Sequence, residues 1–161
     1  MKNLLSALFL IFSFISFGQT DDESAALEVH NLERMSLGIE PLKWSNNLTV
    51  AAKKYADYLA ANDLFNHSKN LESLGQGENL YATQYYVIDE GGAKYFYDET
   101  NYLADASIAW LDEKKKFRYA KIGSRKNNFY LTGHYTQMIW SKSTEVGMAF
   151  SKSKSGNVYV V

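Results

Sequence analysis

Apolar side chains in the early part of the chain recur at the spacing of a helix. Between residues 21 and 37 they stand at Ala25, Val29 and Leu32, which places them on one helix face. Acidic residues crowd the start of this stretch, and Gly38 follows its end, as is common where helices begin and stop. The pattern predicts a first helix over residues 21–37.

A second helix is predicted after an extended connection, residues 39–44, that contains the only proline. Ser45 is a residue type favoured at the N-cap of a helix. Beyond it the apolar face steps by four, three and four residues, through Leu48, Ala52, Tyr55 and Leu59. We expect this helix to end near Asn62 and Asp63.

A third helix is predicted from about Thr100 or Asn101, and one position on its apolar face is charged. The apolar members of that face are spaced by three, four and seven residues: Leu103, Ala106, Trp110 and Phe117. The position missing from this series is Glu113. Because burying a charge is costly, a carboxylate on an apolar face needs an explanation.

Two short apolar runs near the C-terminus predict a β-hairpin. Residues 146–150 and 158–161 are separated by residues 151–157, whose Ser, Lys and Gly content suits a turn. A tyrosine-rich segment, residues 81–97, shows no clear period and is left unassigned. Helices and strands mixed without regular alternation predict an α+β fold, with a sheet sandwiched between helical layers.

The first 18 residues have the layout of a secretory signal peptide. One basic residue, Lys2, precedes an apolar run that is too short to span a bilayer, and acidic residues follow it. Ser16 and Gly18 place the predicted cleavage before Gln19. We therefore expect a secreted, extracellular protein without a stable membrane anchor.

The remaining composition fits one domain without disulfide bonds. Removing 18 of 161 residues leaves 143, enough for a single core, and no cysteine is present. Packing of the many aromatic residues is expected to supply the stability. The formal net charge is −1 and becomes about −2 without Lys2, so nucleic acid is not expected as a partner.

Two of the three histidines stand in unusual surroundings. His134 lies between a glycine and a run of aromatic and aliphatic residues that ends at Trp140. His67 lies beside turn-forming residues, and Glu78 follows in a similar setting. Imidazole and carboxylate together form a ligand set that suits zinc and similar divalent metals. With Glu113, these residues are the candidate site.

These segments, in this order, resemble the CAP superfamily, a secreted group that includes cysteine-rich secretory proteins, antigen 5 proteins and plant pathogenesis-related class 1 proteins. The resemblance covers residues 30–161 and is strongest in the octapeptide 133–140. The other segments that carry it are residues 30–34, 41–44, 66–68, 77–80, 110–113 and 146–147.

The resemblance implies a three-layer α-β-α sandwich whose cleft can hold a divalent cation. Carried over to this chain, the metal residues are His67, Glu78, Glu113 and His134. Several members of the family bind sterols or other lipids in grooves, and some act as secreted effectors or toxins. The leading hypothesis is a secreted binding module with a lipid, sterol or protein ligand.

Two other interpretations of the same residues stay open. Zinc held by two imidazoles can activate a water molecule, so Glu78 or Glu113 would be the general base of a metal-dependent hydrolase or protease. Alternatively, His67 and His134 form hydrogen-bonded pairs with the two glutamates without any metal. His30 is interpreted as structural, because it belongs to the segment that braces the first helix in the family.

The sequence departs from the family pattern in two ways. Eukaryotic relatives commonly carry disulfide bonds, whereas this chain resembles a cysteine-free branch. The last strand of the family is usually followed by a short segment with proline and glycine, which is not found here. We therefore expect the domain, residues 19–161, to lack the end of that strand and the C-terminal segment. Either the sequence is truncated there, or the strand has no closing segment, which would leave an exposed sheet edge.

Overall fold

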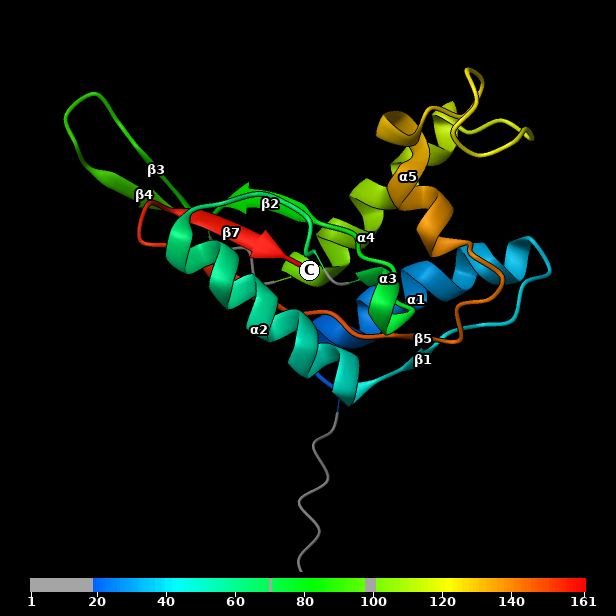
Figure 1. Cartoon of the computed structure of the whole chain (residues 1–161). Helices are drawn as coiled ribbons and strands as arrows, with labels where there is room; N and C mark the ends of the chain where they lie inside the picture. The colour runs from blue at the N-terminus through cyan, green and yellow to red at the C-terminus, as the bar shows by residue number, and fades with distance from the viewer. Residues whose placement is uncertain (1–18, 70, 98–100) are drawn as a thin grey trace, which may run out of the picture.

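A computed structural model describes residues 19–69, 71–97 and 101–161, so the predicted signal peptide, residues 1–18, lies outside the described residues. Figure 1 shows helices arranged around a small central sheet. The elements, in chain order, are α1 (Asp21–Ser36), β1 (Lys43–Trp44), α2 (Asn46–Asn62), α3 (Leu71–Leu74), β2 (Tyr81–Gln84), β3 (Tyr86–Ile88), β4 (Lys94–Phe96), α4 (Tyr102–Asp112), the 3-10 helix η1 (Glu113–Lys116), α5 (Phe129–Met138), β5 (Glu145–Val146), β6 (Phe150–Lys152) and β7 (Asn157–Val160).

The middle layer is an antiparallel sheet in the order β2-β7-β6. Successive side chains of a strand point to opposite faces of the sheet, so the side chains of β7 alternate between two hydrophobic clusters. Val158 and Val160 join the cluster that contains Trp110 of α4, whereas Tyr159 joins the cluster that contains Leu59 of α2. Helices therefore cover both faces, and α1 packs against α4. This is the predicted three-layer sandwich.

All three predicted helices are present, with one change at the end of the third. α1 begins with a capping box, in which Thr20 Oγ1 accepts from the Glu23 amide and Glu23 Oε2 accepts from the Thr20 amide. α2 follows Ser45 and ends at Asn62, as expected. α4 ends at Asp112, and the chain tightens into η1 before it reaches Phe117.

The buried face of α1 is polar, which its apolar spacing did not predict. Leu32 is 57% exposed, whereas His30, Glu33 and Arg34 are buried. Each buried polar group is paired: His30 Nδ1 donates to the carbonyl of Ala26 at 2.9 Å. Burial lowers the pKa of His30, so its ring stays neutral, in agreement with a structural role.

The C-terminal hairpin forms as predicted, but it starts later. β6 and β7 pair from Phe150 with Val160 to Lys152 with Val158. Val146 instead pairs with Trp44 in the short parallel ladder of β1 and β5. Gly147 turns the chain there against α2, where a Cβ atom would lie 2.3 Å from the backbone nitrogen of Thr49.

The prediction that the last strand forms an exposed edge is wrong. β7 lies between β2 and β6 and is hydrogen-bonded on both sides. The tyrosine-rich segment supplies the missing neighbour, because Tyr81–Gln84 forms β2. The same segment continues into the β3–β4 hairpin, which projects from the body in Figure 1. There Tyr86 packs against Phe96, with ring centroids 5.5 Å apart.

Asp63 connects the end of α2 to the β6–β7 hairpin by hydrogen bonds. It caps the helix in the left-handed conformation, with φ 51°, which aspartate tolerates better than most residues. Its Oδ1 atom accepts hydrogen bonds from the Tyr159 hydroxyl at 2.9 Å and from Asn157 Nδ2 at 3.2 Å. Hydrogen bonds from Ser155, Tyr159 and Asn157 lower the pKa of Asp63 from 3.8 to about 2.

We expect Asp63→Asn to lower the free energy of unfolding at neutral pH, because the amide keeps the backbone geometry but weakens charge-assisted bonds. The folded-state pKa lies below the unfolded one, so this stabilisation is complete above about pH 4 and is lost as the pH falls towards about 2. Denaturant titrations across that range should show the difference shrinking in acid. A difference independent of pH would show that the charge is not its source.

Candidate functional site

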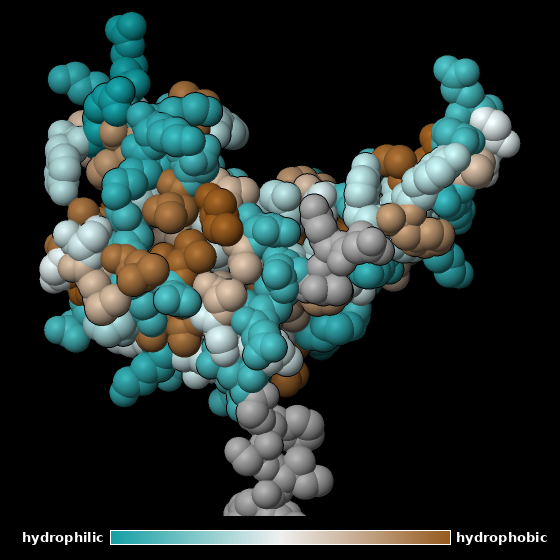
Figure 2. Space-filling model, turned by 180° about the vertical axis from the view of Figure 1, so that it is seen from behind, coloured by the Kyte–Doolittle hydropathy of each residue, from teal (hydrophilic) through white to brown (hydrophobic). Residues whose placement is uncertain are grey.

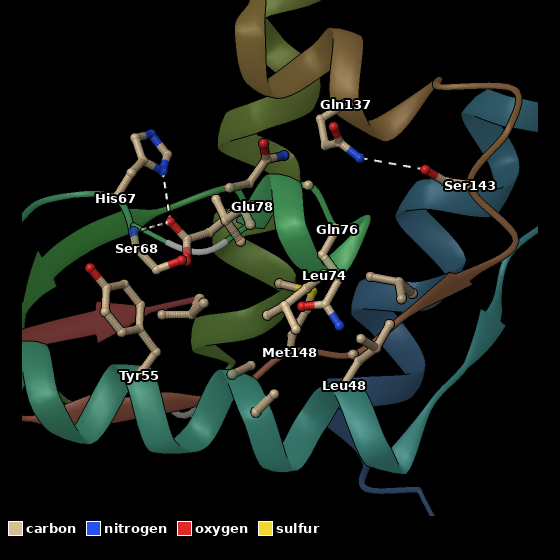
Figure 3. Close-up of a pocket in the computed structure, with 18 of the residues that line it drawn as sticks. Leu48, Tyr55, His67, Ser68, Leu74, Gln76, Glu78, Gln137, Ser143 and Met148 are labelled. Atoms are coloured by element: carbon tan, nitrogen blue, oxygen red, sulfur yellow. Dashed lines mark hydrogen bonds and ion pairs between the residues drawn. The ribbon is translucent and has the colours of Figure 1, made fainter.

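The first candidate pair joins the loop after α2 to the segment that precedes β2. His67 Nδ1 donates to Glu78 Oε1 at 2.8 Å, and the backbone amide of Ser68 donates to the same oxygen at 3.0 Å (Figure 3). The Glu78 side chain is 5% exposed, whereas that of His67 is 59% exposed. A buried carboxylate therefore holds a histidine that faces solvent.

The second pair joins η1 to α5. Glu113 Oε1 accepts from His134 Nδ1 at 2.7 Å, and Glu113 Oε2 accepts from the backbone amide of Tyr135 at 3.0 Å. The His134 side chain is 36% exposed and that of Glu113 is 19% exposed. This pairing explains how a charged residue is accommodated on the otherwise apolar face. Both histidines are thus held in the same way, by a carboxylate that also accepts a backbone amide.

Residues 77–80 contact both pairs. Glu78 holds His67, and the next residue, Asn79, donates from Nδ2 to the carbonyl of His134 at 3.1 Å. Trp110 Nε1 then donates to the carbonyl of Leu80 at 3.2 Å. The same indole lies against the ring of His134, with centroids 6.1 Å apart and planes 24° apart. Asn79 and Trp110 stood in the motifs of the resemblance, but were not predicted as site residues.

A buried carboxylate of α1, Glu33, supports the second pair; it lies in segment 30–34 of the resemblance but was not predicted as a site residue. Glu33 Oε1 accepts from the Tyr135 hydroxyl at 2.7 Å, and Glu33 Oε2 pairs with Lys114 Nζ at 2.8 Å. Lys114 follows Glu113 and Tyr135 follows His134, so one carboxylate fixes the neighbours of both partners. Burial, followed by the hydrogen bond that the hydroxyl donates to Glu33, raises the pKa of Tyr135. The phenol therefore stays a hydrogen-bond donor.

An apolar groove lies beside the first pair, between α2 and the segment around α3 (Figure 3). Its volume is about 1330 Å³. His67 and Glu78 belong to its lining, whereas His134 and Glu113 do not. The apolar side chains of the lining include Leu48, Leu59, Leu74, Met148 and Val161.

Gly77 lets the Gln137 side chain of α5 pack closely against the backbone at this groove. A Cβ atom at residue 77 would lie 2.3 Å from Oε1 of Gln137, so a larger residue would displace that side chain. Gln137 also donates weakly to the Ser143 hydroxyl at 3.4 Å. The glycine of one predicted motif and the glutamine of another thus pack together.

The four candidate residues form two pairs and not one set of ligands. Within the described residues, no three His, Cys, Asp or Glu side chains lie close enough together to hold one metal ion. In each pair the carboxylate engages Nδ1, so a neutral ring presents the lone pair of Nε2 on its other edge. This carboxylate–histidine arrangement is the one found behind metal-bound imidazoles. Metal binding stays a prediction, with the imidazoles as the fitting ligands.

Comparison with known proteins identifies the family. The family model described as "Cysteine-rich secretory protein family" (CAP) matches residues 27–161, most of the chain. The chain belongs to this family.

Two relatives illustrate its range. Pathogenesis-related protein 1B of Nicotiana tabacum is 32% identical over 156 residues, covering 96% of this chain and 79% of its own. The Golgi-associated plant pathogenesis-related protein 1 of Homo sapiens is 31% identical over 136 residues, which cover 84% of this chain and 76% of the human protein. Relatives of this family are mostly secreted or extracellular, although the human one is Golgi-associated.

Solved structures share the fold at lower identity. The crystal structure of NaASP2 with Zn²⁺ has a TM-score of 0.65 and 22% identity, covering 89% of this chain and 79% of that one. The structure of BmVAL-1 has a TM-score of 0.62 and 18% identity, and the match covers 94% of this chain and 79% of BmVAL-1. Across the described residues of the present chain, no helix is both long and apolar enough to cross a membrane.

The hydrogen bonds of the two pairs predict the tautomer of both histidines. In the neutral rings, the proton of His67 and of His134 should reside on Nδ1, because each faces a carboxylate acceptor. Two-bond ¹H–¹⁵N correlation spectra would report this directly. Glu113→Ala should release His134 to a mixture of tautomers and leave His67 unchanged. Protonation of both rings on Nε2 in the parent protein would contradict the described geometry.

Proposed function

We propose that this protein is a secreted CAP-domain binding module that combines a histidine cation site with an apolar groove for a lipid or sterol. The observation that carries the proposal is the shared geometry of His67 and His134, in which a carboxylate accepts from Nδ1 and leaves Nε2 on the other edge of the ring. The predicted signal peptide and the mostly extracellular relatives support secretion.

Zinc is the divalent cation that suits the donor atoms best. His67 and His134 would be its ligands, while Glu78 and Glu113 fix the rings from behind. A bound ion supplies a Lewis acid that can fix an oxygen of a polar ligand group. The similar fold of NaASP2, solved with Zn²⁺, gives this proposal further support.

The groove suits an elongated apolar ligand with one polar end. Its volume of about 1330 Å³ is larger than a typical small-molecule site, and its walls carry Leu48, Leu59 and Met148. The first pair forms a polar part of the lining, where the head of a lipid or sterol would meet His67. A protein ligand with an apolar segment is the other occupant that this lining could accept.

Both glutamates are already used in a way that favours binding over hydrolysis. Each accepts a hydrogen bond from a histidine and another from a backbone amide. A general base must be able to reach the water it activates, and the oxygens that accept these bonds are already engaged by the histidines and the backbone. The metal-dependent hydrolase is therefore the weaker hypothesis.

Calorimetric titration of Zn²⁺ tests the cation site. We expect binding to the parent protein, and loss of at least about tenfold in affinity in the His67→Ala, His134→Ala double variant, because two imidazole ligands are removed. His30→Asn is the matched control, since this histidine is buried and hydrogen-bonded to Ala26. Equal affinity in the double variant and the parent, with circular dichroism showing both folded, would contradict the proposal.

A turnover assay separates the module from the hydrolase. With zinc present, we expect no hydrolysis of lipid esters or peptides above the buffer rate, because Glu78 and Glu113 are engaged with their histidines. A fluorescent sterol or fatty acid should nevertheless bind. Hydrolysis that disappears in Glu113→Ala would overturn the binding-only function and assign Glu113 the role of general base.

A further inference from the structure

Positive charge in this chain is concentrated in one segment. Residues 114–131, here called the basic lobe, contain seven of the 17 Lys and Arg residues and no Asp or Glu. The other 143 residues carry ten basic and 18 acidic side chains. A lobe of charge +7 thus stands on a body of charge −8. The small net charge of −1 is the sum of these two opposite charges and does not reveal their separation.

The lobe projects from the body of the molecule. It comprises the end of η1, the following loop and the first residues of α5, at the upper right of Figure 1. In Figure 2 the same projection, at the upper left, is mainly hydrophilic. Its outer surface is therefore open to a large partner.

The loop of the lobe is built around one buried asparagine. Asn127 is 0% exposed, and its side chain donates to the carbonyls of Arg118 and Ala120 and accepts from the Arg118 amide at 2.8 Å. Its own carbonyl accepts from the Gly123 amide at 2.9 Å. These bonds close the loop on itself, so the surrounding cations are presented on a defined surface.

Most of the cations of the lobe have no acidic partner. Lys114 pairs with Glu33 and Lys115 pairs with Asp112. Among the described residues, no ion pair includes any of the other five, Lys116, Arg118, Lys121, Arg125 and Lys126. Their charge is therefore available to an anionic partner.

Large apolar and aromatic side chains stand uncovered beside these cations. Tyr119 is 93% exposed, Tyr130 94% and Phe129 65%. Two aliphatic residues, Ile122 and Leu131, are exposed by 38% and 47%. Aromatic residues favour the interface between water and lipid, and aliphatic side chains next to lysines suit shallow insertion there.

We propose that the basic lobe docks this protein peripherally on an anionic lipid surface. The five unpaired cations would engage the headgroups, while side chains such as Tyr119 and Tyr130 enter the headgroup layer. The acidic body is repelled by the same surface, which directs the lobe towards it. Ile122 and Leu131 favour lipid over a nucleic acid or an anionic polysaccharide, because those polymers offer little apolar surface to aliphatic groups. This proposal is independent of the cleft and its cation.

Vesicle sedimentation tests the proposal with the protein expressed from its complete sequence. We expect binding to vesicles of phosphatidylcholine mixed with phosphatidylserine, little binding to phosphatidylcholine alone, and weaker binding as sodium chloride is added. Lys121→Gln with Lys126→Gln should weaken binding about 30-fold, since each lysine near such a surface contributes about a factor of five. The matched pair Lys43→Gln with Lys154→Gln removes the same charge elsewhere and should bind as the parent does.

The aromatic part of the proposal has its own test. Tyr119→Ser with Tyr130→Ser should weaken binding to the anionic vesicles and leave binding to dextran sulfate or single-stranded DNA unchanged. Equal binding to both kinds of vesicle, no binding, or equal losses in the two lysine pairs would overturn the proposal. Tighter binding to a polyanion, with no dependence on the tyrosines for vesicles, would also overturn it and assign the lobe to such a polymer. Circular dichroism verifies that each variant is folded.

Discussion

The burial of the Arg34 guanidinium is the interaction on which the rest of this domain depends. Its nitrogens donate to the carbonyls of Glu40, Met138, Trp140 and Ser143, at 2.8 to 3.0 Å. These carbonyls belong to the connection after α1 and to the chain that leaves α5, so one side chain of α1 fixes both. A buried charge is costly, and this one is tolerated because four acceptors replace its water. Substitution would leave those carbonyls without a donor as well.

Because α1 anchors the end of α5 in this way, contacts inside the protein determine the position of His134, which lies on α5. Glu33, one residue before Arg34, holds Tyr135 and Lys114, which adjoin the two members of the second pair. From the other side, Asn79 holds the carbonyl of His134. The candidate site is therefore the exposed end of a hydrogen-bonded network that begins inside the protein. Such support limits how far the rings can move when a ligand arrives.

Sequence patterns predicted those parts of the structure in which local spacing and tertiary packing agree. α2 and α4 bury the apolar faces that their spacing indicates, and Glu113 was recognised because its charge interrupts such a face. α5 was not predicted as a helix, since Gly133 in its interior costs about 1 kcal/mol and its threonines are weak helix formers. Tertiary contacts with η1 and α4 compensate. Glu33 could not be identified, because its partners lie 81 and 102 positions away.

The two members of the second pair enclose the basic lobe in the sequence. Glu113 and His134 are 21 positions apart, and the whole basic lobe lies between them. Their hydrogen bond closes this loop at its base, and the entropy of closing a loop changes slowly with its length. Substitutions in the lobe beyond Lys114, or insertions there, can therefore alter its exposed surface while the pair keeps its geometry. In this fold, the charged surface of the lobe can diverge while the hydrogen-bonded pair at its base is retained.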